Sequence, residues 1–335
     1  MIGLQGATDS SEVCALPLPG RIDEEVAAFN ASVAANVTQT PSVLTTTPAR
    51  VRAGRRTGLS TFAPRIRSEI ATDRVIAAPG HDLILRVFRP LAVHGVYLHM
   101  HGGGFVVGAA DEQDRLLEEL ARECSVVVVS VNYRLAPEDR YPAAVDDCEA
   151  AALWLIGNSE REFGTDRRCI GGESAGANLA VSTLVRLRER HRVADAYAAA
   201  ILNYGFFDLS LTPSAVAAGE ESLVLSTSLL RRYVELYVDP ATRIIEPEAS
   251  PLRAHLGGLP PALFTVGTHD PLLDDTAFMA ARWASAGSAA RLLVVPGALH
   301  GFLEASTSFA RRSREQIYRF VTDRLRISIE EDHQT

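Results

Sequence analysis

The feature that most constrains the fold is an alternation of short apolar runs with longer amphipathic segments, which begins near residue 70. The apolar runs have the length of strands, and the segments between them have the spacing of helices. Short, uniformly apolar strands separated by helices are typical of a mostly parallel sheet that helices cover on both faces. The sequence therefore predicts an α/β fold.

The alternation also gives approximate boundaries for the elements. The first two strands, 73–78 and 83–88, are expected to form a hairpin because Pro79 and Gly80 separate them. Six further strands are expected at 96–100, 125–131, 168–171, 198–203, 262–266 and 291–295. Helices are expected at 112–124, 142–156, 175–190, 274–287 and 309–325.

Two regions depart from this alternation. Residues 1–65 contain one helical segment, 22–37, followed by a stretch rich in Thr, Pro and Arg. The interval between Asn203 and Ala262 has no convincing strand, but it has a helical segment at 228–238. An insertion this long in a compact fold is usually functional, so we expect a helical cap. The expected division is a cap segment at 1–65, an α/β domain at 66–204 and 246–335, and an inserted cap segment at 205–245.

The composition excludes several classes of protein. The net charge of −8 argues against a nucleic-acid partner, which would require a basic surface. All 33 basic residues are arginine, so mechanisms that use a lysine nucleophile are excluded. No apolar run approaches the ~20 residues of a membrane span, and no signal peptide is evident, so we expect a cytoplasmic protein. The cysteines follow no metal-binding spacing and are expected to be buried, reduced thiols: Cys14, Cys124, Cys148 and Cys169.

The sequence Gly-Glu-Ser-Ala-Gly at 172–176 joins an expected strand to an expected helix. A serine in such a tight turn has a strained backbone, and glycine is needed on both sides because larger neighbours would collide. The turn exposes the hydroxyl of Ser174 and places the amide of Ala175 at the start of a helix, where N–H groups carry positive partial charge. The structural alternative is a serine that only caps the helix.

A serine nucleophile also requires hydrogen-bond donors for an oxyanion, and the glycines 102–104 are the candidates. They follow an expected strand, and the absence of side chains leaves their backbone amides free. The run fits neither of the common phosphate-binding glycine patterns, although a simple flexible turn is an alternative. His99 and His101 could form a metal pair, but no third ligand lies nearby in the sequence.

The best candidate for the base is His300, because it follows the strand at 291–295, and α/β sheets build sites at the carboxyl ends of strands. Asp270 follows the preceding strand in the same way and is the candidate acid. Asp274 and Asp275 begin the next helix, where carboxylates have a structural explanation. The order Ser174, Asp270, His300 is that of α/β-hydrolases.

With these motifs the chain resembles the hormone-sensitive-lipase-like esterases, which are α/β-hydrolases that carry an HGGG sequence. The resemblance extends over about residues 75 to 325. The segments that carry it are HGGGF at 101–105, NYRLAPE at 132–138, YPAAVDD at 141–147, GESAGANLA at 172–180, SPL at 250–252, LPPALFTVGTHDPLLDD at 259–275 and HGF at 300–302.

The resemblance implies an α/β-hydrolase fold, with a mostly parallel eight-stranded sheet flanked by helices and a helical cap. It implies a carboxylesterase that hydrolyses short- to medium-chain esters without a metal or cofactor, and a homodimer formed near the last strand. In the family, His101 supports the glycine loop. The implied catalytic residues are the nucleophile Ser174, the base His300 and its partner Asp270, with the amides of Gly103, Gly104 and Ala175 as the oxyanion hole.

Two positions depart from the family pattern, and other activities remain open. Glu173 occupies a position that is usually aspartate, and Ala177 occupies one that is usually glycine. The same residues could serve a thioesterase, an amidase or a peptidase, because fold and triad do not determine the leaving group. A receptor of the same fold, like the plant gibberellin receptors, would lack the histidine that is present here as His300.

Overall fold

The computed structural model describes residues 22–59 and 66–326. These residues contain one sheet with the strand order β1-β2-β4-β3-β5-β6-β7-β8. The strands are β1 (Ala71–Ala78), β2 (His81–Phe88), β3 (Gly95–Met100), β4 (Val126–Val131), β5 (Arg168–Glu173), β6 (Ala199–Asn203), β7 (Ala262–Gly267) and β8 (Ala290–Val295). Strand β2 is antiparallel to both β1 and β4, and every pair from β4 to β8 is parallel. The predicted α/β-hydrolase fold is confirmed.

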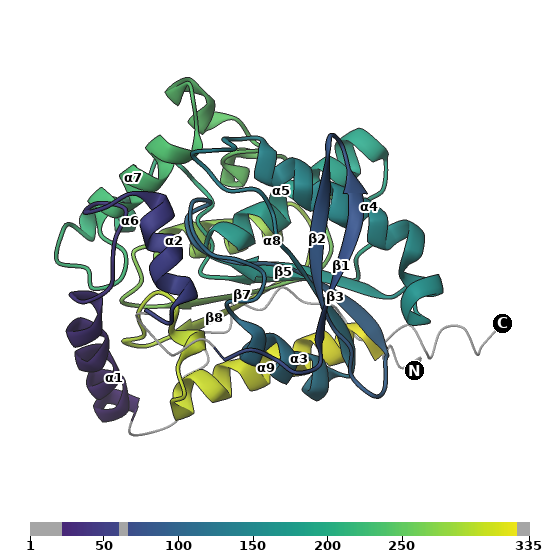
Figure 1. The fold of residues 1–335 in the computed structure, drawn as a ribbon, viewed down its shortest axis with the longest axis horizontal. Helices are drawn as coiled ribbons and strands as arrows, with labels where there is room; N and C mark the ends of the chain where they lie inside the picture. The colour runs from purple at the N-terminus through teal and green to yellow at the C-terminus, as the bar shows by residue number, and fades with distance from the viewer. Residues whose placement is uncertain (1–21, 60–65, 327–335) are drawn as a thin grey trace, which may run out of the picture.

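Helices cover both faces of the sheet (Figure 1). One face carries α4 (Ala143–Phe163), α5 (Ala175–His191) and α8 (Leu273–Ser285), and the other carries α3 (Asp114–Cys124) and α9 (Ser308–Arg326). All five were expected from the sequence. Covering on both faces explains why the central strands are apolar without alternation: every residue of β3 and β4 is buried.

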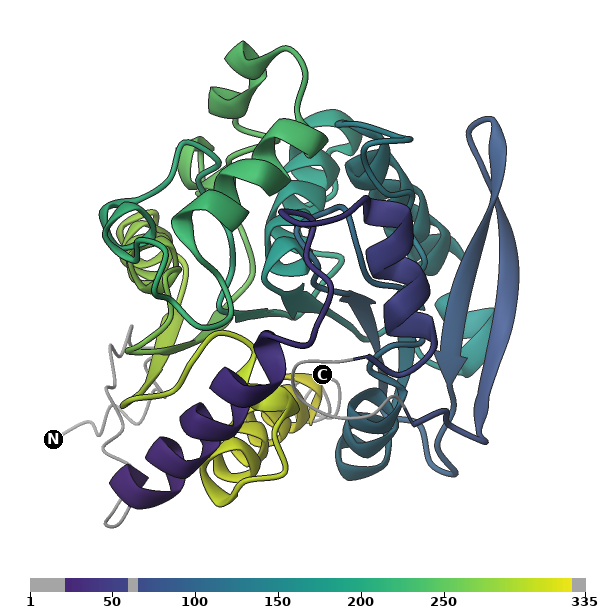
Figure 2. The ribbon, with the colours of Figure 1, turned by 60° about the vertical axis from the view of Figure 1, so that its left-hand side comes forward.

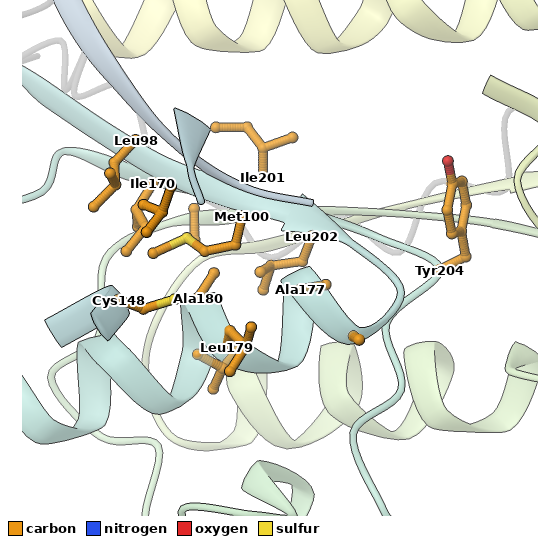
Figure 3. Packing of buried hydrophobic residues seen from close by; sticks show 14 of the residues in the cluster. Leu98, Met100, Cys148, Ile170, Ala177, Leu179, Ala180, Ile201, Leu202 and Tyr204 are labelled. Atoms are coloured by element: carbon orange, nitrogen blue, oxygen red, sulfur yellow. The ribbon is translucent and has the colours of Figure 1, made fainter. Parts of the chain in front are cut away.

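The core packs α5 closely against the sheet, which fixes the start of this helix. Figure 3 shows Leu98 and Met100 on the side of the sheet that faces Ala177 and Ala180 of α5, while Ile201 points to the opposite side. All five side chains are fully buried. Because the helix residues at the contact are small, the helix axis can approach the strands, and its N-terminus lies at the carboxyl edge of the sheet.

Further helices lie outside the two layers at one end of the sheet (Figures 1 and 2). They are α1 (Ile22–Val37), α2 (Pro48–Arg56), α6 (Pro213–Ala217) and α7 (Thr227–Tyr237), with short 3-10 helices at Ala241–Ile245, Pro251–Arg253 and Phe302–Glu304. The expected helices at 22–37 and 228–238 are confirmed, and the described part of the long insertion contains no strand.

Helix α2 was not predicted, because the sequence at this place has little apolar periodicity. Its N-terminus is nevertheless well specified: Thr47 caps the helix by accepting from the Arg50 amide, and Pro48 occupies the first turn. Only Val51 of this helix is buried. Polar contacts therefore have to hold α2 in place.

The remaining expectations concern cysteines and membranes. Cys124, Cys148 and Cys169 are free and buried, and burial raises the pKa of the Cys124 and Cys169 thiols to about 12. Cys14 lies outside the described residues. Among the helices at 22–59 and 66–326, none is long and apolar enough to cross a membrane.

Candidate active site

Ser174 lies in the turn between β5 and α5, with φ 55° and ψ −118°. These angles are uncommon for a residue with a side chain and place strain at this one position. A β-carbon on Gly176 would overlap the carbonyl oxygen of Met100, so only glycine permits the close approach of α5 to β3. The Ser174 amide donates to the carbonyl of Asn203 at 3.0 Å, which fixes the turn against β6.

The structure brings together the three residues that the sequence singled out. The hydroxyl of Ser174 lies 3.0 Å from Nε2 of His300, and Nδ1 of His300 lies 2.9 Å from Oδ2 of Asp270. Because an ionised carboxylate can only accept, Nδ1 carries the proton and Nε2 is free to accept from Ser174. Asp270 and His300 are only 3% and 8% exposed. The arrangement can accept a proton from the serine and stabilise the resulting imidazolium.

The two neighbouring aspartates have different surroundings. Both begin α8, but Asp275 is fully buried and accepts from the amides of Phe207 and Asp208 and the hydroxyl of Thr212. Burial raises its pKa to about 7. Asp274 accepts from an amide in the first turn of α6. The expectation of simple helix-end charges was therefore incomplete, because both carboxylates also anchor the inserted segment.

The glycine loop after β3 lies beside the serine. The N–H groups of Gly103 and Gly104 make no hydrogen bond within the described part of the chain, and the first amide of α5, at Ala175, has no intrahelical acceptor. Gly104 has φ +60°, and a β-carbon there would collide with the ring of Tyr233 from α7. The loop thus offers free donors and packs directly against the inserted segment.

His101 contacts this glycine loop through its side chain. Its Nδ1 lies 2.8 Å from the carbonyl of Gly102, and its ring stacks on Tyr133 with centroids 4.1 Å apart. The Tyr133 hydroxyl donates to the His101 carbonyl at 2.7 Å. Burial lowers the pKa of His101 to about 3, so this histidine is neutral at physiological pH.

Glu173, the residue that departs from the family pattern, pairs with His99. Its Oε2 lies 2.8 Å from Nε2 of His99, whose Nδ1 lies 2.9 Å from the hydroxyl of Ser130. Both ring nitrogens of His99 are therefore occupied by protein groups, and it does not form a metal pair with His101. The described residues contain no group of three or more His, Cys, Asp or Glu that could hold a metal. No local pattern in the sequence indicates the contact between Glu173 and His99.

A cavity of about 390 Å³ opens above Ser174. Tyr204 and Phe206, which follow β6, line this cavity together with Ser174, His300 and the glycine loop. Residues between 37 and 59 and between 220 and 233 line it as well. Both regions that the sequence marked as irregular therefore line the same cavity.

Two arginines of α2, which sequence reasoning missed, attach this helix to the domain. Arg52 donates to the carbonyls of Val106 and Ala136 at 2.9 and 3.0 Å, and Arg55 pairs with Glu112 at 2.8 Å. Val106 belongs to the turn that follows the three glycines, so Arg52 connects α2 to the glycine loop. The spacing of three residues, which places both arginines on one face of a helix, was the available signal.

Comparison with known proteins places this geometry in a family. A family model described as the alpha/beta hydrolase fold matches residues 97–304. The chain is 32% identical to the ethyl acetate hydrolase of Pseudomonas putida over 232 residues, which cover 67% of this chain and 72% of that protein. It is also 32% identical to the carboxylesterase NlhH of Mycobacterium tuberculosis over 250 residues, which cover 72% of this chain and 76% of that protein.

Solved structures agree with the sequence relatives. The carboxylesterase EstE1 from a metagenomic library superimposes with a TM-score of 0.77 at 30% identity, covering 85% of this chain and 99% of that one. A hormone-sensitive lipase from a metagenome library gives a TM-score of 0.78 at 28% identity, with coverage of 90% and 98%. The chain belongs to the α/β-hydrolase fold family. Within that family it is a carboxylic ester hydrolase of the hormone-sensitive-lipase-like group, as the sequence predicted.

Proposed function

We propose that this chain is a serine carboxylesterase in which Ser174, His300 and Asp270 act as nucleophile, base and orienting acid. The observation that carries the proposal is the continuous hydrogen-bond path from the serine hydroxyl through the imidazole to a buried carboxylate, with distances of 3.0 and 2.9 Å. A serine that only capped the helix would not require a contact with a histidine that is itself hydrogen-bonded to a buried carboxylate.

In the proposed mechanism, His300 takes the proton of Ser174 while the serine oxygen attacks the ester carbonyl. The amides of Gly103, Gly104 and Ala175 stabilise the oxyanion of the tetrahedral intermediate. His300 then protonates the leaving alcohol, and an acyl group remains on the serine. Water, activated by the same histidine, releases the acid and restores the enzyme. No step requires a metal or cofactor.

We further propose that the substrates are small esters with short- to medium-chain acyl groups. The cavity volume of about 390 Å³ supports this limit, because a long acyl chain would have to extend out of it. One similar protein is named an ethyl acetate hydrolase, which also favours a short acyl group. A series of p-nitrophenyl esters from acetate to palmitate tests the limit, and a maximum at palmitate would contradict it.

The cap is part of the proposal. We assign residues 1–65 and 205–245 to a cap over an α/β domain formed by 66–204 and 246–335. The contacts of both cap regions with the cavity support this division. Such a cap would set which esters reach the serine.

The assignment of the nucleophile can be tested directly. A p-nitrophenyl phosphonate should label Ser174 stoichiometrically, and p-nitrophenyl butyrate should give a burst of p-nitrophenol equal to the enzyme concentration if deacylation is slow. A thioester and an anilide with the same acyl group should be hydrolysed more slowly than the oxygen ester. Labelling of another residue, or faster hydrolysis of the anilide, would overturn the proposal.

We also propose a cytoplasmic homodimer that associates through β8. This strand ends the sheet order, so its outer edge has no partner among the strands described, and exposed edges are places where chains pair. Sedimentation should show twice the chain mass of 36.1 kDa at micromolar concentration. A single 36.1 kDa species would remove this part of the proposal.

A further inference from the structure

The charges that line the cavity are unequal. Four carboxylates face it, and a single arginine is present among the described residues of its wall: Glu112, Glu173, Glu220 and Glu304 against Arg55. Arg55 pairs with Glu112 and His99 pairs with Glu173. Glu220 is exposed at the rim and bonds the hydroxyl of Ser228. Glu304 is therefore the carboxylate inside the cavity whose side chain is bound by neither an arginine nor a histidine among the described residues.

Glu304 follows the proposed base by four residues and lines the same cavity. It ends the 3-10 helix Phe302–Glu304, which begins two residues after His300. Its Oε1 accepts from the side-chain amide of Gln113 at 3.2 Å, and its Oε2 has no partner among the described residues. Burial raises its pKa to about 7 despite the opposing charge of Arg55, and the nearby Glu173 and Glu112 act in the same direction as burial. A cationic group next to this carboxylate would therefore be stabilised.

The position of Glu304 relates it to one half of the substrate. Because His300 must protonate the leaving oxygen, the alcohol half of the ester has to lie on the His300 side of the serine. Tyr204 lines the same cavity and contacts the His300 ring edge-on, with centroids 4.9 Å apart.

We propose that Glu304 makes this esterase selective for esters of cationic alcohols, such as amino alcohols and their quaternary derivatives, and unfavourable to esters whose alcohol carries a carboxylate. The inference rests on the proposed function, because it concerns the leaving-group side of the same site. Glu304 is a specificity residue in this proposal and takes no part in proton transfer.

The test compares substrates that differ in charge and little in shape. Choline butyrate and its uncharged isostere 3,3-dimethylbutyl butyrate form one pair, and 3-butyryloxypropanoate supplies the anionic case. For the wild-type enzyme we expect kcat/KM for choline butyrate to exceed that of the isostere about five- to tenfold at low salt, and the anionic ester to be the poorest. The ratio of the first two should rise between pH 6 and pH 8 as Glu304 ionises, because comparing two esters on one enzyme cancels the pH effects that they share.

The variants assign the effect to one residue. Glu304→Gln should reduce the cation-to-neutral ratio to about one and leave kcat/KM for the neutral isostere nearly unchanged. The matched control Glu220→Gln removes the rim carboxylate and should keep most of the selectivity. If Glu304→Gln fails to fold, the wild-type enzyme can be measured in 0.5 M NaCl instead. Because salt screens charge interactions, the ratio of kcat/KM for the cationic ester to that for the neutral ester should then fall.

The outcomes separate the two proposals. If the wild-type enzyme does not hydrolyse 3,3-dimethylbutyl butyrate, the proposed function fails. If it hydrolyses that ester but shows no preference for choline butyrate, or if Glu304→Gln retains the preference, the inference about Glu304 is wrong and the proposed function is unaffected. A preference confined to esters with a cationic acyl group would likewise overturn the assignment to the alcohol side.

Discussion

The two sides of the cavity are held in place by different forces. On the sheet side, Ser174 has a strained backbone, and Asp270 and His300 are almost completely buried. On the cap side, α2 buries only Val51 and is attached through arginines whose side chains are partly exposed, 18% for Arg52 and 35% for Arg55. Close packing of backbone fixes the first side, whereas polar side-chain contacts attach the α2 part of the second.

This difference implies that the two sides of the cavity tolerate substitutions to different degrees. Residues of the sheet side cannot shift without disturbing β3, β5 and α5. Substitutions there should therefore either abolish activity or leave it unchanged. Contacts on the cap side can be exchanged while the sheet remains folded, so substitutions there should change rates and selectivity by smaller factors. Five predictions test this contrast.

The largest effect is expected for Ser174→Ala. Loss of the nucleophile should lower kcat for p-nitrophenyl butyrate by about 10⁴-fold or more. The melting temperature should change little, because alanine fits the same turn. Steady-state kinetics and thermal unfolding measure both. A loss of less than about 10³-fold would mean that another group attacks the ester.

Asp270→Asn should come next, with a loss of about 10⁴-fold in kcat, because an asparagine favours the wrong tautomer of His300. Asp274→Asn is the matched control, since Asp274 lies four residues further on and contacts the inserted segment instead of the imidazole. It should retain activity within about tenfold. The reverse result would require a different acid in the triad.

Arg52→Gln tests the cap side. The shorter, uncharged side chain cannot reach both the Val106 and Ala136 carbonyls, so the glycine loop should lose part of its support. We expect kcat to fall about tenfold, with a melting temperature close to that of the wild type. Arg56→Gln, on the exposed side of the same helix, should behave like the wild type. If both substitutions lowered kcat equally, the positive charge of α2, and not the hydrogen bonds of Arg52, would be what affects catalysis.

The smallest effect on catalysis, but a clear one on stability, is expected at Asp275. Asp275→Ala leaves the amides of Phe207 and Asp208 without an acceptor and should lower the free energy of unfolding by about 3 kcal/mol. Asp275→Asn keeps an acceptor and should cost much less. Urea titrations of both variants measure the difference.

The same residue gives a pH dependence of known sign. Its pKa in the folded state, about 7, is higher than the ordinary value of 3.8, so the folded protein binds more protons between these values. The contribution of Asp275 to stability is therefore fully present below about pH 4 and is lost as the pH rises through 7. Relative to Asp275→Asn, the wild type should lose at least about 1 kcal/mol between pH 5 and pH 8. A constant difference would contradict the raised pKa.

The sequence predicted the sheet side well for a physical reason. Strands, the serine turn and the glycine loop are each specified by residues within a few positions, so local patterns suffice to find them. Asp270 and His300 could be placed because the ends of parallel strands meet at one edge of the sheet. The proximity of these residues in the structure is consistent with that placement.

The cap side could not be predicted in the same way. The contacts of Arg52 join residues 54 and 84 positions apart, so the spacing of Arg52 and Arg55 indicates a shared helix face but not what that face contacts. The burial of Asp275 depends on a loop that comes 63 to 68 positions earlier. On the sheet side, the pairing of Glu173 with His99 was missed for the same reason, because it spans 74 positions. Such contacts arise only when the folded chain brings distant segments together.

The attachment of α1 has a consequence for how the protein is made. Asn30 donates to the carbonyl of Gly297 at 3.0 Å, and Glu25 accepts from the amide of Ser308 at 2.7 Å. The ribosome therefore produces Asn30 some 267 residues before its partner Gly297, a delay of roughly 15 to 50 s at ordinary elongation rates. During translation the growing chain carries α1 before these partners exist. The helix reaches its final position only after the last strand has left the exit tunnel.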